Sequence, residues 1–112
     1  MKTVDGIWSL EFYGTLGWEP RGILILKDGT CAGGARNHYS LGTYTVSRRN
    51  VDIHLDLEYF GKIRTLFGSK DRTFSLIIKG KRTGDEIAGS VTRPEKDILP
   101  LQCRLKKRHE MK

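Results

Sequence analysis

The chain has 112 residues, enough for one domain with a single hydrophobic core and too few for a second. Its formal net charge is +7 and 38% of its residues are hydrophobic, and no segment approaches the ~20 consecutive apolar residues of a membrane-spanning helix. Because the first predicted strand follows directly on residues 1–5, no apolar core of a signal peptide fits before it, and we expect a cytosolic protein without a membrane partner.

Apolar and polar residues alternate with a period of two through nearly the whole chain, which predicts β-strands. The clearest case is Val51–Glu58, where Val, Ile and Leu alternate with Asp, His and Glu. Such strands bury only one face, so the sheet must curl around one core, and closing it removes exposed edges. The sequence therefore predicts an all-β fold: a single antiparallel up-and-down barrel of about eight strands over residues 1–112.

The first half of the chain contains clear turn signals between its predicted strands. The strands are expected at residues 6–14, 21–27, 30–36, 39–47 and 50–58. A connection from Thr15 to Pro20 is predicted to be a loop that carries Trp18. Asp28-Gly29 is the strongest hairpin signal in the chain and predicts a type I′ turn, and Arg48-Arg49 is predicted to be a short turn.

The second half of the chain continues the same pattern with weaker signals. Strands are expected at residues 60–67, 73–81 and 86–92, and from Leu99 onward. In the last strand, the residues predicted to point inward are Leu99, Leu101, Cys103 and Leu105. We expect the tail Lys107–Lys112 to be frayed.

The positive charge gathers in two outward rows, Lys79 and Lys81 on one strand and Arg104, Lys106 and Arg108 on the last. A single-stranded nucleic-acid binder also needs aromatic side chains on that surface for stacking, and here the aromatic residues fall mainly on inward positions. We therefore interpret the basic rows as a solvated outer wall and do not expect nucleic acid as a partner.

Residue patterns for catalysis are absent from the sequence. His54 lies between Asp52 and Asp56 on one outward strand face, but no fourth metal ligand or supporting group is implied, so we interpret the three as a solvated polar face. Cys31 and Cys103 form no zinc pattern and are expected to be free thiols, with Cys103 buried. We expect no enzyme activity, no cofactor and no metal.

The opening Gly6-Ile7-Trp8 places a large indole where it plugs one end of a barrel, and this feature resembles lipocalin-like (calycin) proteins. In that family a basic residue of the last strand often covers the Trp, which here implies Arg104 or Lys106. Trp8 and Trp18 are the candidate residues for a barrel end or a ligand site.

The amino-terminal half also resembles the GrlR family, small bacterial negative regulators of type III secretion. The resemblance covers about the first sixty residues. It lies in the order of five pieces: Gly6-Ile7-Trp8, Arg21-Gly22-Ile23-Leu24-Ile25, Asp28-Gly29, Gly33-Gly34 and Ser40-Leu41-Gly42-Thr43-Tyr44. It implies a lipocalin-like barrel that forms a homodimer and acts by binding a transcriptional activator.

The chain departs from that family in two places. Ala35 follows the Gly-Gly pair where relatives commonly have Asp, and the turn Ser47–Asn50 is basic where the founding regulators are acidic. This reversal of charge would reverse the electrostatic complementarity of an interface built on the turn. Arg48, Arg49 and Asn50 are therefore candidate partner-binding residues for an acidic surface.

Two hypotheses for the function follow. The first is a non-enzymatic protein-interaction module, a negative regulator that binds a transcriptional activator. The alternative is a carrier of a small apolar ligand that enters one barrel end near Trp18. Bulky side chains at most inward positions favour the first, whereas a connected cavity of ~300 Å³ or more would favour the carrier.

Overall fold

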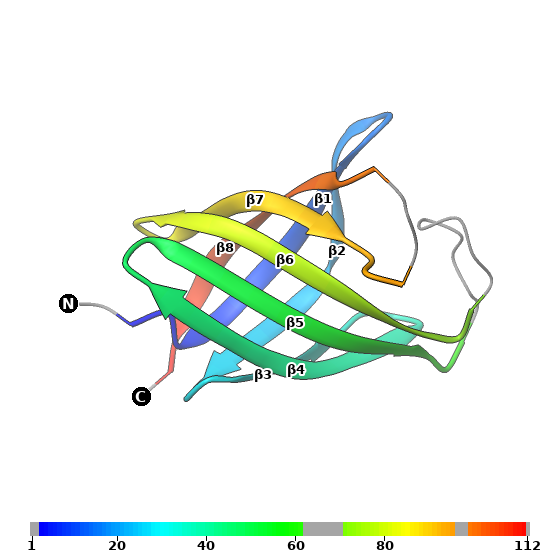
Figure 1. The fold of residues 1–112 in the computed structure, drawn as a ribbon, viewed down its shortest axis with the longest axis horizontal. Helices are drawn as coiled ribbons and strands as arrows, with labels where there is room; N and C mark the ends of the chain where they lie inside the picture. Colours follow the sequence, from blue (N-terminus) through cyan, green and yellow to red (C-terminus); the bar gives the residue numbers. More distant parts are fainter. Residues whose placement is uncertain (1–2, 62–70, 96–98, 112) are drawn as a thin grey trace.

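The computed structural model describes residues 3–61, 71–95 and 99–111. Within these residues the chain forms eight strands: β1 (Gly6–Gly14), β2 (Gly17–Lys27), β3 (Thr30–Gly34), β4 (His38–Ser47), β5 (Asn50–Tyr59), β6 (Thr73–Thr83), β7 (Glu86–Thr92) and β8 (Leu101–Glu110). Each strand pairs antiparallel with the next, and β8 pairs with β1 (Figure 1), so the predicted closed up-and-down barrel is confirmed. No helix in the described ranges is long and apolar enough to cross a membrane.

The first connection differs from the prediction. Gly14 pairs with Gly17 across a two-residue turn, so β2 begins earlier than expected and Trp18 lies in a strand instead of a loop. The resulting hairpin projects beyond the barrel in Figure 1. The second turn agrees with the prediction, because Asp28 and Gly29 both have positive φ, as a type I′ turn requires. The weak strand predicted at 60–67 falls largely on 62–70, outside the described residues.

The last strand was predicted incorrectly at both ends. Leu99 is 87% exposed and precedes β8, which begins only after Pro100. At the other end the strand continues to Glu110, which pairs with Gly6 of β1. Residues 107–110 are therefore part of the barrel wall and not a frayed tail, because β1 supplies hydrogen-bonding partners for them.

The alternation predicted for β5 is confirmed. Val51, Ile53, Leu55 and Leu57 are all buried, whereas His54 and the acidic residues at 56 and 58 are exposed. The inward positions of the other strands supply the rest of one core, which includes Trp8, Leu10 and Phe12 of β1. The core is thus the inside of the barrel.

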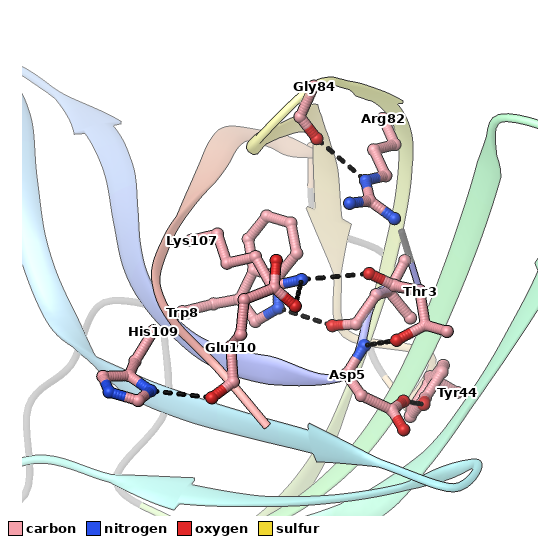
Figure 2. A network of polar contacts seen from close by, with 10 residues as sticks. Thr3, Asp5, Trp8, Tyr44, Arg82, Gly84, Lys107, His109 and Glu110 are labelled. Atoms are coloured by element: carbon pink, nitrogen blue, oxygen red, sulfur yellow. Dashed lines mark hydrogen bonds and ion pairs between the residues drawn. The ribbon is translucent and has the colours of Figure 1, made fainter. Parts of the chain in front are cut away.

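Trp8 closes one end of the barrel. Its ring is fully buried, and its indole N–H donates a hydrogen bond to the carbonyl oxygen of Val4 at 2.8 Å (Figure 2). The segment before β1 is held over the ring by a second contact, because the hydroxyl of Tyr44 donates to the carboxylate of Asp5. The amino-terminal segment therefore caps the plugged end.

Two cations cover Trp8, and neither is the residue that the resemblance implied. The Lys107 ammonium lies 5.7 Å from a Trp8 ring centre and the Arg82 guanidinium lies 5.9 Å away. The β1–β8 register shifts just before Trp8, which places Lys107 opposite it. Arg104 and Lys106 come before Lys107 in β8 and pair with Glu11 and Ser9, so the expectation for these two residues was wrong.

Candidate ligand cavity

A cavity of about 320 Å³ lies inside the barrel, at the end opposite Trp8. It corrects the expectation that bulky side chains fill the interior. The reason lies in β2, β3 and β4, whose inward positions include small residues. By strand register, Gly22 lies opposite Leu10 and Ser40 lies opposite Leu57, and both of these small residues line the cavity. The bulky residues of the other strands face these positions without filling the space between them.

The walls of the cavity are mainly apolar. Its buried aliphatic and aromatic lining consists of Leu10, Phe12, Leu24, Leu55, Leu57, Tyr59, Phe74 and Leu76. At its outer end the exposed residues Pro20, Ala35 and Arg36 also line it, so the cavity reaches the surface there. A volume of this size is at the lower end of the range of ~300–1,000 Å³ typical of small-molecule sites.

A β-bulge brings Arg21 into the wall of this cavity. The β1–β2 register shifts after Leu10, and Arg21 becomes an extra residue without a partner on β1. Gly22 beside it has a φ of +133°, and a Cβ there would lie 2.4 Å from the carbonyl oxygen of Gly34. Only glycine fits this close approach, so the sequence Arg-Gly is what allows the bulge.

The guanidinium of Arg21 is held by two neighbours. Its Nη2 donates to the carboxylate of Glu19 at 2.6 Å, and its Cζ lies 5.9 Å from the ring centre of Phe12. The side chain is only 18% exposed, and its Nε is buried without a hydrogen-bond partner. The guanidinium of Arg21 is therefore paired with Glu19 on one edge and buried at its Nε.

Aromatic rings continue from the mouth into the barrel. The His38 ring packs edge-on against Tyr59 at 5.6 Å, and Tyr59 lies 6.1 Å from Phe74, both measured between ring centres. Burial lowers the pKa of His38, which favours a neutral imidazole at neutral pH. Arg93, almost fully buried, lies over the Phe74 ring at 4.6 Å and pairs with Asp71 at 2.6 Å. This side of the mouth is therefore firmly packed.

The two candidate Trp residues do not line the cavity. Trp8 lies at the opposite end of the barrel. Trp18 packs on the outside of the barrel. Its ring centres lie 5.3 Å from the ring centre of Tyr13 and 4.3 Å from the guanidinium carbon of Arg104. Arg104 in turn donates to Glu11 at 2.7 Å, and this hydrogen bond lowers the pKa of Glu11. Sequence reasoning missed Arg21 and His38 as cavity residues; the glycine after Arg21, inside a predicted strand, was the available signal for a bulge.

The predicted partner-binding turn borders a second, shallower hollow at the Trp8 end. Arg48 and Arg49 are exposed and line it together with Arg82, whose backbone N–H donates to the Arg49 carbonyl at 2.7 Å. Asn50 is exposed at the start of β5 and is not part of its wall. The hollow holds about 790 Å³; its wall combines the buried Val4 and Tyr44 with exposed residues such as Val46, and it is more open to solvent than the cavity inside the barrel. The cavity inside the barrel, with its mainly apolar and buried lining, is therefore the better candidate for a small-molecule site.

The remaining polar features of the outer wall are less specific. Asp56 accepts a hydrogen bond from the Ser75 hydroxyl at 2.8 Å, and no group of three or more His, Cys, Asp or Glu side chains in the described parts of the chain is placed to hold a metal ion. The two basic rows lie on β6 and β8, on either side of β7. In the second row, Arg108 donates to the Ser9 hydroxyl at 2.9 Å.

An apolar strip runs over the outside of β2, β3 and β4. The register places Ile25 beside Ala32 and Leu41, and Ile23 beside Gly34 and Tyr39. The four large side chains of the strip, Ile23, Ile25, Tyr39 and Leu41, are exposed, and Leu41 is the most exposed at 56%. The ring of Phe60 stacks on that of Tyr39. The outer face of β2 is therefore apolar at Ile23 and Ile25.

Comparison of the sequence with protein-family models gives no match, and comparison with curated proteins gives none.

Proposed function

We propose that this barrel binds a small, mainly apolar molecule in the cavity lined by Leu10, Leu57 and Phe74. The observation that carries the proposal is the volume of about 320 Å³ inside the barrel, enclosed mainly by apolar walls and open at one end. Filling such a cavity with an apolar ligand removes its walls from water and restores dispersion contacts, and both effects favour binding. A carrier role requires no catalytic group.

Fluorescence of N-phenyl-1-naphthylamine, an uncharged dye that brightens in apolar surroundings, tests the proposal. We expect saturable binding at one site per chain. The variant Leu57→Trp should fill part of the cavity and weaken dye binding at least tenfold, because a well-packed site leaves no room for the added ring.

The matched control is Val46→Trp, which adds the same ring beside the open hollow at the other end. It should bind the dye as the unmodified chain does. Dye binding that does not saturate would contradict the cavity as the site. So would a dye affinity that falls in Val46→Trp and not in Leu57→Trp. Denaturant unfolding of both variants establishes that they are folded.

A second candidate function, supported by the apolar strip on β2–β4, is that of a protein-interaction module that forms a homodimer. Ile23, Ile25 and Leu41 together expose apolar surface that a second copy of the chain would cover. Light scattering at tens of micromolar should then give the mass of a dimer. Leu41→Asp should give a monomer, whereas Thr43→Asp, two residues along the exposed face of the same strand, should not. A monomer mass for the unmodified chain would contradict this candidate.

The regulatory role implied by the GrlR resemblance is part of this second candidate. Arg48 and Arg49 are exposed and would offer two forked cations to an acidic activator. Replacing both with Glu should slow association with such a partner and leave the fold intact. The free, buried thiols of Cys31 and Cys103 fit the reducing cytosol in which such a regulator works.

A further inference from the structure

The middle of β7 presents two small side chains to the outside, between two rows of cations. By strand register Ala88 lies between Lys81 of β6 and Arg104 of β8, and Ser90 lies opposite Lys79. Neighbouring strands are ~4.8 Å apart, so the two rows are separated by roughly 10 Å. One extended molecule along β7 can therefore contact both rows. We call this surface the basic face; its residues are Lys79, Lys81, Ala88, Ser90, Arg104 and Lys106.

Three lysines of the basic face have no acidic side chain in contact. Within the described parts of the chain, Lys79, Lys81 and Lys106 form no ion pair. The acidic residues opposite them in register are Glu86, which pairs with Lys106 at the start of β7, and Asp52, which pairs with Lys79 from β5. Both acids lie at the border of the basic face, so its middle is positive.

Two aromatic side chains continue the basic face on the hairpin of β1 and β2. The Tyr13 ring is 51% exposed and packs edge-on against Trp18. Trp18 in turn lies against the guanidinium of Arg104, which Glu11 holds in place. We expected no nucleic-acid partner because aromatic residues fall mainly on inward positions, and that reason does not apply to Tyr13 and Trp18.

We propose that the basic face binds single-stranded nucleic acid, with phosphates at Lys79, Lys81 and Lys106 and one base stacked on Tyr13. A single strand combines a polyanionic backbone with unpaired bases, and proteins that bind it combine a basic surface with exposed aromatic rings. An acidic protein surface would match the lysines and would make no use of a stacking ring. None of these four residues lines the cavity, so this inference is independent of the proposed carrier function.

Fluorescence anisotropy with a labelled oligothymidine of about 12 nucleotides, within the usual range of site sizes, tests the backbone contacts. We expect saturable binding at low salt. The logarithm of the binding constant should fall with the logarithm of the salt concentration with a slope of about −2, as three phosphate contacts predict. Lys81→Gln should weaken binding at least about threefold and reduce that slope to about −1.4. Arg36→Gln removes the same charge from the connection between β3 and β4, across the barrel from β7, and should change neither.

An abasic chain with the same number of phosphates tests the stacked base. The unmodified protein should bind oligothymidine at least about fivefold more tightly than the abasic chain, because stacking on an aromatic ring requires a base. Tyr13→Leu should abolish this preference. Tyr39→Leu, which removes a ring of similar exposure from the other side of the barrel, should retain it.

Each outcome supports or contradicts the inference. Absence of binding at low salt would overturn it, and so would equal affinity for oligothymidine and the abasic chain or equal displacement by polyglutamate, which would show a surface that attracts any polyanion. Equal losses in Lys81→Gln and Arg36→Gln would exclude the basic face as the site. If Tyr13→Leu does not fold, the comparison of oligothymidine with the abasic chain on the unmodified protein still decides.

Discussion

The ammonium group of Lys107 lies 5.7 Å from a ring centre of Trp8 and donates a hydrogen bond to the carbonyl oxygen of Thr3 at 3.0 Å. It also pairs with Glu110 at 2.9 Å, and the lysine side chain is only 3% exposed. One cation thus ties the last strand, the plug residue and the amino-terminal segment together.

Replacing Lys107 with Met keeps the aliphatic stem and removes the charge. We expect the free energy of unfolding to fall by about 2–3 kcal/mol, near the lower end of the sum of a cation–π contact and a hydrogen bond from a charged group. Lys106→Met on the outer face serves as the control and should change the free energy of unfolding by less than ~0.5 kcal/mol. Urea unfolding measures both, and equal effects would contradict the role given to Lys107.

The Tyr44 hydroxyl should hold the amino-terminal cap through Asp5. Tyr44→Phe deletes only that hydroxyl and leaves Asp5 with the backbone N–H of Asp28 as a donor, so we expect a loss of about 1–2 kcal/mol in the free energy of unfolding. Tyr39→Phe removes a hydroxyl from an exposed ring and should be nearly neutral. Thermal unfolding of the two variants makes the comparison; a Tyr44→Phe chain as stable as Tyr39→Phe would show that the contact contributes nothing.

Two neighbouring substitutions in β5 test the inward and outward faces. Ile53 is fully buried, so Ile53→Asp places a charge in the core and should cost at least ~4 kcal/mol or prevent folding. His54→Asp, one residue further on and exposed, should remain within ~0.5 kcal/mol of the unmodified chain. Circular dichroism and denaturant midpoints measure the difference, and similar midpoints would be incompatible with the barrel.

The two thiols predict how stability depends on pH. Burial raises the pKa of Cys103 to about 12 and that of Cys31 to about 11, from an ordinary value of 9.0. Above pH 9 the unfolded chain has lost these protons while the folded chain keeps them, so raising the pH favours unfolding.

The free energy of unfolding should therefore fall between pH 8 and pH 10, by about 1 kcal/mol for each thiol. The double variant Cys31→Ala/Cys103→Ala should lose correspondingly less over the same interval, whatever its stability at pH 8. Urea titrations at the two pH values provide the four free energies. An equal loss in both proteins would show that the thiols are not the groups responsible.

Strand positions were largely predictable because a period of two is a property of the extended backbone itself. Val51–Glu58 shows it without interruption, and a register slip of one residue would expose every apolar side chain, so the sequence permits one arrangement. The type I′ turn at Asp28-Gly29 was predictable for a similar reason, since few residue pairs accept its dihedral angles.

The cavity and its charged residue were not predictable in the same way. Its volume depends on how residues of different strands face one another, and Gly22 is far from Leu57 and Phe74 in the sequence. Arg21 lines the cavity only because the β1–β2 register shifts beside it. The same holds for Lys107, which reaches Trp8 through a second register shift that involves strands at opposite ends of the chain.

The seam between β1 and β8 joins the most distant parts of the sequence; Glu11 and Arg104, which pair across it, are 93 positions apart. Closing so long a loop costs more chain entropy than forming any of the hairpins, so the seam is expected to be the last part of the barrel to assemble. The beginning of β1 and the end of β8 also lie together at the end farthest from the cavity mouth (Figure 1). A short linker between them, with new termini opened at Asp28-Gly29, would turn the slowest pairing into a local hairpin and leave the mouth clear.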